Sequence, residues 1–343
     1  RVKKIIPRIS NTELIALRSG TVSLDRDIFK GNIVIPKKVE LPLENTVITK
    51  NVNTILDKWG SQQRLFPSKM FKEILNDIGS NKLFSLIIKE KWGGNYLSVS
   101  QLSSILTKIS SANPALGVTI MVPNSLGPAE LLEHYGTDIQ KKKYLPKLAS
   151  GELIPCFGLT GPNNGSDALG AIDKGKLIRD NGELKIKVNL NKRYITLAPI
   201  ANLAGIAFNL EDPNNLLKNN DIIDIKLGIT VALIEKAIYT NLQNTHHNPL
   251  DVGFPNGTLK GNLKLDVDDV IGGEKNIGHG WKMLMECLAA GRGICLPATA
   301  KASANAASIG IYYYALHRKQ FKMPILEMEG VKNKIADMLY HTW

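Results

Sequence analysis

The sequence predicts an α+β protein whose parts follow one another in the order helical, β and helical. Apolar residues recur at intervals of three and four after Pro67, at intervals of two after Glu152, and again at the helical interval after Gly280. These three observations predict an irregular N-terminal extension at 1–65, an N-terminal helical domain at 66–151, a central small β-barrel or sandwich domain at 152–276, and the start of an incomplete C-terminal helical bundle domain at 277–343.

The composition is that of a globular protein. The chain has 343 residues, of which 43% are hydrophobic and 22% charged, and no apolar run reaches the roughly 18 residues of a membrane-spanning helix. The formal net charge is +12. The lysines are scattered and no recognition motif accompanies them, so we expect no nucleic acid partner. Three cysteines without a CxxC pair argue against a disulfide framework or a zinc site.

The cysteine usage favours a reducing cytoplasm. The chain begins at Arg1, with further basic residues at Lys3, Lys4 and Arg8. A basic flank of this kind can lie beside a membrane anchor. We therefore expect a cytoplasmic protein, or one that is associated with a membrane through an N-terminal segment missing before Arg1.

Residues 1–65 contain short apolar pieces separated by prolines and are expected to be extended. The helical period begins with Phe71, Ile74 and Ile78 on one face. Ser100 is a candidate N-cap for a helix that stops near Asn113. Two more helices are expected, at 129–136 and 138–150.

The β region contains an Asn181-Gly182 turn between two alternating segments, which is typical of a hairpin over residues 177–188. Further strands are expected at 203–210, 228–234 and 257–267. After His279 the pattern is helical again, first to about Leu288 and then in an alanine-rich helix at 298–316. A last amphipathic helix is expected after Pro324.

One loop is a candidate ligand site. A strand ending near Leu159 and Thr160 continues into Gly161-Pro162-Asn163-Asn164-Gly165. Glycine and asparagine permit positive φ and let backbone N–H groups face a flat ring or a phosphate. Taken alone, such a cluster is also typical of an ordinary turn.

Three stretches, at 156–171, 191–196 and 317–321, together resemble the flavin-binding segments of the acyl-CoA dehydrogenase family. The segments 122–128, 191–199 and 291–294 are similar to its bacterial fatty-acid-oxidation branch. The resemblance covers residues 67–343. It implies FAD-dependent α,β-desaturation of fatty acyl-CoA to trans-2-enoyl-CoA in fatty acid β-oxidation, with electrons passed to an electron-transfer flavoprotein.

The resemblance also implies roles for individual residues. Phe157, Gly158, Leu159 and Thr160 match the segment whose backbone and threonine hydroxyl bind the isoalloxazine ring of FAD. Tyr194, Ile195 and Thr196 match a second flavin segment, with tyrosine in place of the family's tryptophan. Ser166 matches a contact to acyl-CoA, and Arg292 an arginine at the mouth of the active site. Arg318 and Phe321 match residues that reach the FAD of a neighbouring subunit, so a homo-oligomer is implied.

The catalytic base is where this sequence departs from the family. The family's glutamate would lie beyond Trp343, and the second location used by some members is Gly291 here. Ala289 replaces an aspartate found near the acyl-CoA in other members, and nothing places Glu286 at the substrate's α-carbon. We expect the chain by itself to be a poor dehydrogenase, with apolar helix faces exposed.

Other functions remain as alternatives. The net charge alone supports a relative that keeps the fold and flavin but binds nucleic acid, and a fragment that binds nothing is a third hypothesis. A hydrolase triad of Ser166, Asp167 and His134 lacks the Gly-x-Ser-x-Gly motif. The adjacent His246 and His247 have no further ligands at a useful spacing, so no metal site is expected.

Overall fold

The computed structural model describes residues 9–19, 28–31, 46–62, 64–125, 127–170, 172–217, 226–235 and 253–342. The basic flank at 1–8 and the pair His246-His247 lie outside these residues. Among the described helices, none combines the length and apolar character needed to cross a membrane.

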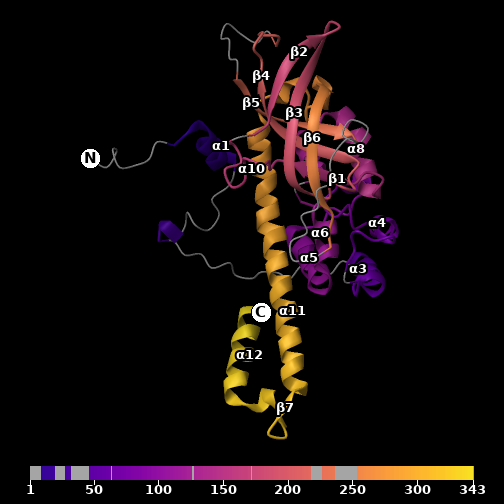
Figure 1. Cartoon of the computed structure of the whole chain (residues 1–343), viewed down its shortest axis with the longest axis vertical. Coiled ribbons are helices and arrows are strands. Elements are labelled where there is room, and N and C mark those ends of the chain that lie inside the picture. Colours follow the sequence, from indigo (N-terminus) through magenta and orange to yellow (C-terminus); the bar gives the residue numbers. More distant parts are fainter. Residues whose placement is uncertain are drawn as a thin grey trace, which may run out of the picture.

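The first part of the chain is helical, and its helices pack beneath and beside the sheet (Figure 1). Its helices are α1 (Asn11–Ser19), α3 (Thr46–Trp59), α4 (Phe71–Ser80), α5 (Val99–Ala112), α6 (Pro114–Met121), α7 (Pro128–Tyr135) and α8 (Asp138–Ser150), with a short 3₁₀ turn at Glu90–Trp92. The pairs α5/α6 and α7/α8 are separated by single turns, at Asn113 and at Gly136-Thr137, which cap the following helices.

Two expectations for this part are wrong. The extension at 1–65 is not irregular throughout, because α1 and α3 lie within it. Helix α3 buries Ile48, Val52 and Ile55 in the same core as α4 and α5. The N-cap of α5 is Ser98 rather than Ser100: its hydroxyl accepts the Gln101 N–H, and the Gln101 side chain accepts the Ser98 N–H.

The middle of the chain forms one six-stranded mixed sheet. Its strands are β1 (Pro155–Gly158), β2 (Lys174–Asp180), β3 (Glu183–Thr196), β4 (Leu203–Glu211), β5 (Lys226–Glu235) and β6 (Asn256–Asp266). One edge of β4 pairs with β5, and the other pairs in parallel first with β1 and then with β2. Strand β3 joins β2 to β6 in antiparallel pairing.

The predicted hairpin is confirmed. Asp180 pairs with Glu183, and the two turn residues Asn181 and Gly182 both have positive φ, as a two-residue turn between twisted strands requires. The expected strands at 203–210, 228–234 and 257–267 correspond to β4, β5 and β6.

The sheet is strongly curved. Just after β6, Val270 forms an antiparallel bridge with Ala232 of β5, and the Ile271 N–H donates to the Val231 carbonyl at 2.9 Å. The chain following one edge strand therefore reaches the other edge. Of the two architectures expected, a single curled sheet of this kind is nearer to a barrel than to a two-sheet sandwich.

The last part is helical and elongated. Helix α10 (Gly280–Ala290) continues through a π-helical turn (Gly291–Cys295) into α11 (Leu296–His317). The first half of α11 packs on α5, and its second half extends beyond the other helices together with α12 (Glu329–Thr342), as Figure 1 shows. Between them, β7 (Lys319–Gln320) and β8 (Met323–Pro324) form a small hairpin.

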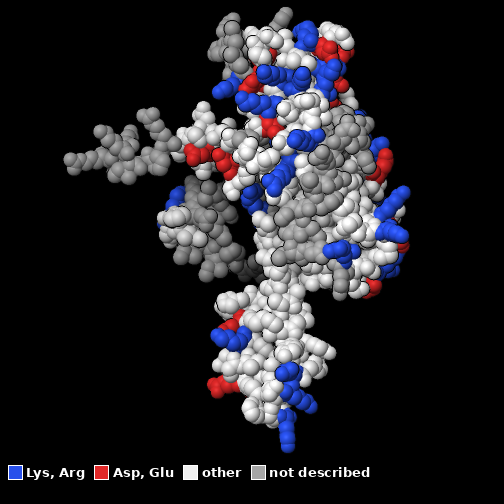
Figure 2. All heavy atoms as spheres, viewed as in Figure 1, with Lys and Arg blue, Asp and Glu red and all other residues white. Residues whose placement is uncertain are grey.

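The extended half of α11 exposes apolar side chains, as the sequence predicts for helices of this region. On the face drawn in Figure 2 this part is largely uncharged, whereas basic and acidic residues are interspersed over the sheet. The exposed large apolar residues of α11 are Leu296, Ile309, Ile311, Tyr312, Tyr313, Tyr314 and Leu316.

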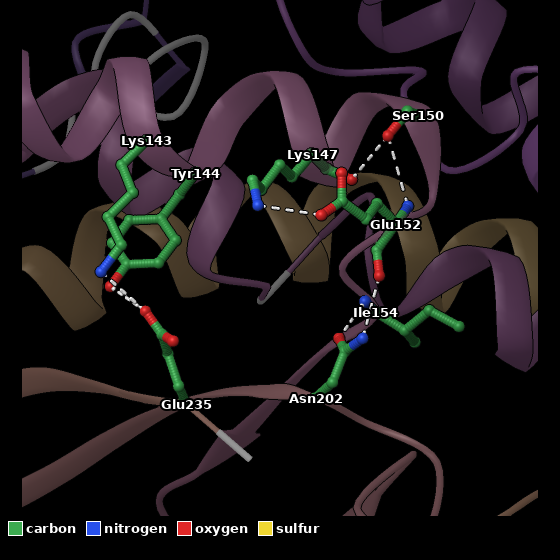
Figure 3. A network of polar contacts seen from close by, with 8 residues as sticks. All are labelled: Lys143, Tyr144, Lys147, Ser150, Glu152, Ile154, Asn202 and Glu235. Atoms are coloured by element: carbon green, nitrogen blue, oxygen red, sulfur yellow. Dashed lines mark hydrogen bonds and ion pairs between the residues drawn. The ribbon is translucent and has the colours of Figure 1, made fainter. Parts of the chain in front are cut away.

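Polar contacts fasten α8 to the sheet (Figure 3). The Tyr144 hydroxyl donates to Glu235 Oε1 at 2.9 Å, and Lys143 pairs with the same carboxylate at 2.7 Å. After α8, Asn202 accepts the Ile154 N–H at 2.6 Å and donates to the Glu152 carbonyl at 2.9 Å. These bonds fix the point at which the chain passes from helix into β1.

Candidate active site

The candidate flavin loop leaves the sheet at the end of β1. Phe157 and Gly158 are buried in the strand, whereas Leu159 and Thr160 are half-buried beyond it. Gly161 and Asn164 then form an antiparallel bridge, which closes the loop on itself. Within the described residues, the Thr160 hydroxyl makes no hydrogen bond, so it is available to a ligand.

The second predicted flavin segment lies directly beside this loop. The Arg193 N–H donates to the Thr160 carbonyl at 2.9 Å. Between Lys192 and Ile195 the pairing of β3 with β6 shifts register, and Tyr194 has a φ of 58°. A bulge of this kind turns side chains away from the sheet's normal alternation. Tyr194 is 44% exposed there, with the Arg193 guanidinium 4.6 Å from its ring.

Two residues that the sequence analysis did not single out, Lys192 and Asp173, support the loop from beneath together with Asn164 of the loop itself. Lys192 is fully buried, and its Nζ donates to the Leu159 carbonyl at 3.1 Å and pairs with Asp173 at 3.1 Å. The Asn164 side-chain amide donates to the same Leu159 carbonyl at 3.1 Å. Burial lowers the pKa of Lys192, against the opposing attraction of Asp173.

The sequence itself indicates that Lys192 faces the core. Ile186, Val188 and Leu190 are buried at alternate positions of β3, and the next position in that alternation is Lys192. A lysine at an inward-facing strand position needs an acidic or carbonyl partner, because an unpaired buried ammonium is costly.

A cavity of about 210 Å³ lies between α5, α7 and the π-helical turn. Its walls are partly apolar, with Leu97, Leu102 and Ile294, and partly polar. The polar side includes Glu130, whose pKa is raised by burial to about 7. Glu133 contributes one carboxylate oxygen paired with Lys89 at 3.1 Å and a second that is buried and has no hydrogen-bond partner among the described residues.

Arg292 belongs to the π-helical turn beside this cavity. It is exposed, and its Nη1 donates to the Leu288 carbonyl at 3.3 Å. A π-helical turn inserts an extra residue into a helix, which re-aims the side chains around it. Glu286 lies one turn earlier on α10, 4.0 Å from Lys282. Ile294 of the same turn lines the cavity, whereas Arg292 is not one of its lining residues.

The remaining predicted site residues lie apart. Ser166 is exposed on the loop after β1, and among the described contacts its hydroxyl bonds neither Asp167 nor His134, so no hydrolase triad is formed. At the far end of α11, Arg318 directly follows the helix and Phe321 lies on the β7–β8 turn. Helix α11 has 22 residues, a length of about 33 Å. One chain does not bring this end to the candidate flavin loop.

All three cysteines are buried, and none is paired in a disulfide. Burial raises the pKa of the Cys156 thiol to about 12, which disfavours the thiolate that a nucleophile or metal ligand requires. In the residues that the structure describes, no group of three His, Cys, Asp or Glu side chains could hold a metal ion.

Comparison with known proteins assigns the family. Residues 45–152 match the family model "Acyl-CoA dehydrogenase, N-terminal domain". The chain is 32% identical over 270 residues to the 3-(aryl)acrylate reductase of Clostridium sporogenes and 30% identical over 275 residues to an acyl-CoA dehydrogenase of Bacillus subtilis. The chain belongs to the acyl-CoA dehydrogenase family. These alignments cover 78% and 80% of this chain and 66% of each relative, so the chain spans slightly less than two thirds of their length.

The same fold is found in solved structures. The structure of an acyl-CoA dehydrogenase complexed with FAD from Bacillus anthracis matches with a TM-score of 0.74 and 22% identity. The match covers 96% of this chain and 53% of that protein. The α+β architecture expected from the sequence is therefore confirmed as an acyl-CoA dehydrogenase fold.

Proposed function

We propose that this chain belongs to an FAD-dependent enzyme that desaturates fatty acyl-CoA to trans-2-enoyl-CoA in fatty acid β-oxidation and passes the electrons to an electron-transfer flavoprotein. The observation that carries the proposal is the hydrogen bond between the Arg193 N–H and the Thr160 carbonyl. It holds side by side two segments that are far apart in sequence and that both resemble flavin-binding segments.

The residues present fit a flavin. The edge of an isoalloxazine ring needs hydrogen-bond donors, and the half-buried Thr160 hydroxyl makes no hydrogen bond within the described chain. The Leu159 carbonyl is already taken by Lys192 and Asn164. Because the C=O and N–H of a planar trans peptide point in opposite directions, the Thr160 N–H is directed away from Lys192. The loop can therefore offer the Thr160 N–H as a donor on the side that faces away from Lys192.

Each part of the site would have a distinct task. Leu159, Thr160 and the bulge at Tyr194 would bind the flavin ring, and Ser166 and Arg292 would bind the acyl-CoA. When bound, FAD supplies the acceptor for the hydride that leaves the acyl β-carbon. The cavity beside Ile294 is suited to part of the acyl chain because several of its walls are apolar.

The proton at the acyl α-carbon needs a base. None of the predicted site residues carries a carboxylate that could accept this proton. We therefore expect the chain by itself to bind FAD but to reduce it slowly with acyl-CoA. Full acyl-CoA dehydrogenation by the purified chain, followed by dye reduction, would contradict this expectation.

Flavin binding is the test of the proposal. Titration of the purified chain with FAD should give saturable binding and a perturbed flavin spectrum. Replacement of Thr160 by valine removes one hydroxyl and should weaken binding by roughly tenfold, the worth of one hydrogen bond in a site of this kind. The matched control is Thr54→Val on the exposed face of α3, where the hydroxyl bonds only its own helix.

A chain that shows no FAD binding at excess FAD would refute the proposal. Because the Clostridium sporogenes relative is named for reduction of a 3-(aryl)acrylate, the flavin-loaded protein should be mixed anaerobically with fatty acyl-CoA and, after reduction, with an aryl acrylate. Slow bleaching of the flavin by acyl-CoA, with no reoxidation by the aryl acrylate, is the expected outcome. Reoxidation of the reduced flavin by the aryl acrylate would contradict the proposed substrate.

A further inference from the structure

Lys192 is unusual in its surroundings. Its side chain is 0% exposed, although lysine carries a long flexible stem and a strongly hydrated charge. The stem packs closely against β1: a Cβ added to Gly158 would lie 3.1 Å from Lys192 Cγ. The residue thus occupies a core position between β3 and β1, where an apolar side chain would be the usual choice.

The ammonium group has two described partners, and both belong to the chain around the flavin loop. Nζ lies 3.1 Å from the Leu159 carbonyl and 3.1 Å from Asp173 Oδ2. The same Asp173 oxygen accepts the Asn191 N–H at 3.0 Å. Asp173 is 13% exposed. The pair is therefore largely shielded from water, where charge-assisted hydrogen bonds are strongest.

The consequence for the loop follows from peptide geometry. The bond to Nζ, with a second bond from Asn164, holds the Leu159 carbonyl inward. The Leu159–Thr160 peptide is planar, so fixing its carbonyl also fixes the direction of the Thr160 N–H and the starting point of the Thr160 side chain. The Arg193 N–H then holds the next carbonyl, that of Thr160.

We propose that Lys192 is a positioning residue, which orients the Leu159–Thr160 peptide for the flavin and thereby sets the affinity and reduction potential of the bound flavin. This inference rests on the proposed function for the flavin, but the orientation of the peptide is a property of the protein itself. Lys192 does not touch the ligand in this assignment. It acts through the backbone of a neighbouring strand.

The test compares Lys192→Met with Lys187→Met. Methionine keeps an unbranched apolar stem for the space beside Gly158 and removes the ammonium. Lys187 lies on the same strand β3 but is exposed, so its replacement controls for charge and composition. Since Lys192→Met leaves Asp173 without its cation, the double variant Lys192→Met/Asp173→Asn is a second test protein in which both charges are absent.

Two measurements are made on each folded protein. Amide hydrogen exchange without flavin should be faster for the peptide containing Leu159 and Thr160 in Lys192→Met and in the double variant, and unchanged in Lys187→Met. With FAD, binding should weaken by about tenfold in the Lys192 variants, and the midpoint potential of the bound flavin should shift. Lys187→Met should match the unsubstituted chain in both.

The outcomes separate the two hypotheses. Unchanged exchange at Leu159 and Thr160 in a folded Lys192 variant overturns the positioning role, whatever the flavin does. Faster exchange with unchanged FAD affinity and potential also overturns it, because the orientation would then not matter to the ligand. If the unsubstituted chain binds no FAD, the proposed function fails and the link to flavin fails with it, while hydrogen exchange still decides the role of Lys192 in the loop.

Discussion

The two parts of the predicted FAD site differ in how they are held. The inner part, residues 157–160 with 194–196, lies between β1 and β3 and is supported by a buried lysine and by backbone bonds. The outer part consists of Arg318, which directly follows α11, and Phe321, which lies on the β7–β8 turn. Phe321 is 89% exposed, and both residues of that turn, Phe321 and Lys322, have positive φ.

This difference shows which part of the predicted FAD site a single chain can hold in place by itself. The inner part is preorganised by the core of the sheet, so its geometry is a property of the single chain. The outer part has a defined backbone, but the Phe321 side chain is exposed and the core of this chain does not fix its position. That arrangement suits the predicted role of Arg318 and Phe321 in reaching the flavin of another subunit.

The largest effect is expected from breaking the ion pair beneath the inner part. Asp173→Ala should lower the free energy of unfolding by about 3 kcal/mol, because it leaves a buried ammonium without its carboxylate. The control is Asp180→Ala at the far end of β2, the strand that begins just after Asp173, where the pair with Lys264 is partly exposed to water and should contribute little to stability. Chemical denaturation measures both. Equal losses in the free energy of unfolding would show that the buried ion pair stabilises the inner part no more than the partly exposed pair does.

A medium effect is expected at the cavity. Because the pKa of Glu130 is about 7 in the folded chain and about 4.3 when unfolded, the folded state binds more protons between those values, and stability falls as the pH rises through this window. Glu130→Gln should remove this dependence. Compared with the unsubstituted chain, the free energy of unfolding of the variant should therefore increase by on the order of 2 kcal/mol between pH 5 and pH 8. Denaturation of both proteins across pH 4 to 9 measures it, and parallel curves would contradict it.

The smallest effect on stability is expected at the outer part. Phe321→Ala should change the free energy of unfolding by less than about 0.5 kcal/mol, because the side chain is exposed. If the outer part reaches a neighbour's flavin, the same substitution should weaken FAD binding in the assembled protein. Light scattering and FAD titration test this together. Unchanged affinity in an oligomer would remove Phe321 from the site.

Much of the fold could be predicted because its signals are local. The Asn181-Gly182 turn identified the β2–β3 hairpin, and the change of period marked where helices give way to strands. Helix α3 was missed although Ile48, Val52 and Ile55 repeat at the helical interval, since the prolines before it suggested extended chain throughout. The capping pair Ser98 and Gln101 could likewise have been found from its spacing.

The candidate site was less accessible to such reasoning. The alternation of β3 predicts regular pairing through Thr196, and nothing in it indicates the bulge after Lys192, which depends on the pairing with β6. Loop residues 159–160 meet β3 because β1 and β3 lie close in the curled sheet, a non-local relationship. The roles of Ser166, Arg292, Arg318 and Phe321 come from the family resemblance and stay predictions.

The parallel pairing of β1 with β4 has a consequence for synthesis. Pro155 to Gly158 find their hydrogen-bonding partners only at Leu203 to Ile206, so the strand that leads to Thr160 cannot dock until that later stretch has left the ribosome. Parallel pairs close large loops and form slowly. While translation proceeds, the helices before Ser150 can already be compact, whereas the cofactor-binding half of the chain still lacks its central strand, β4.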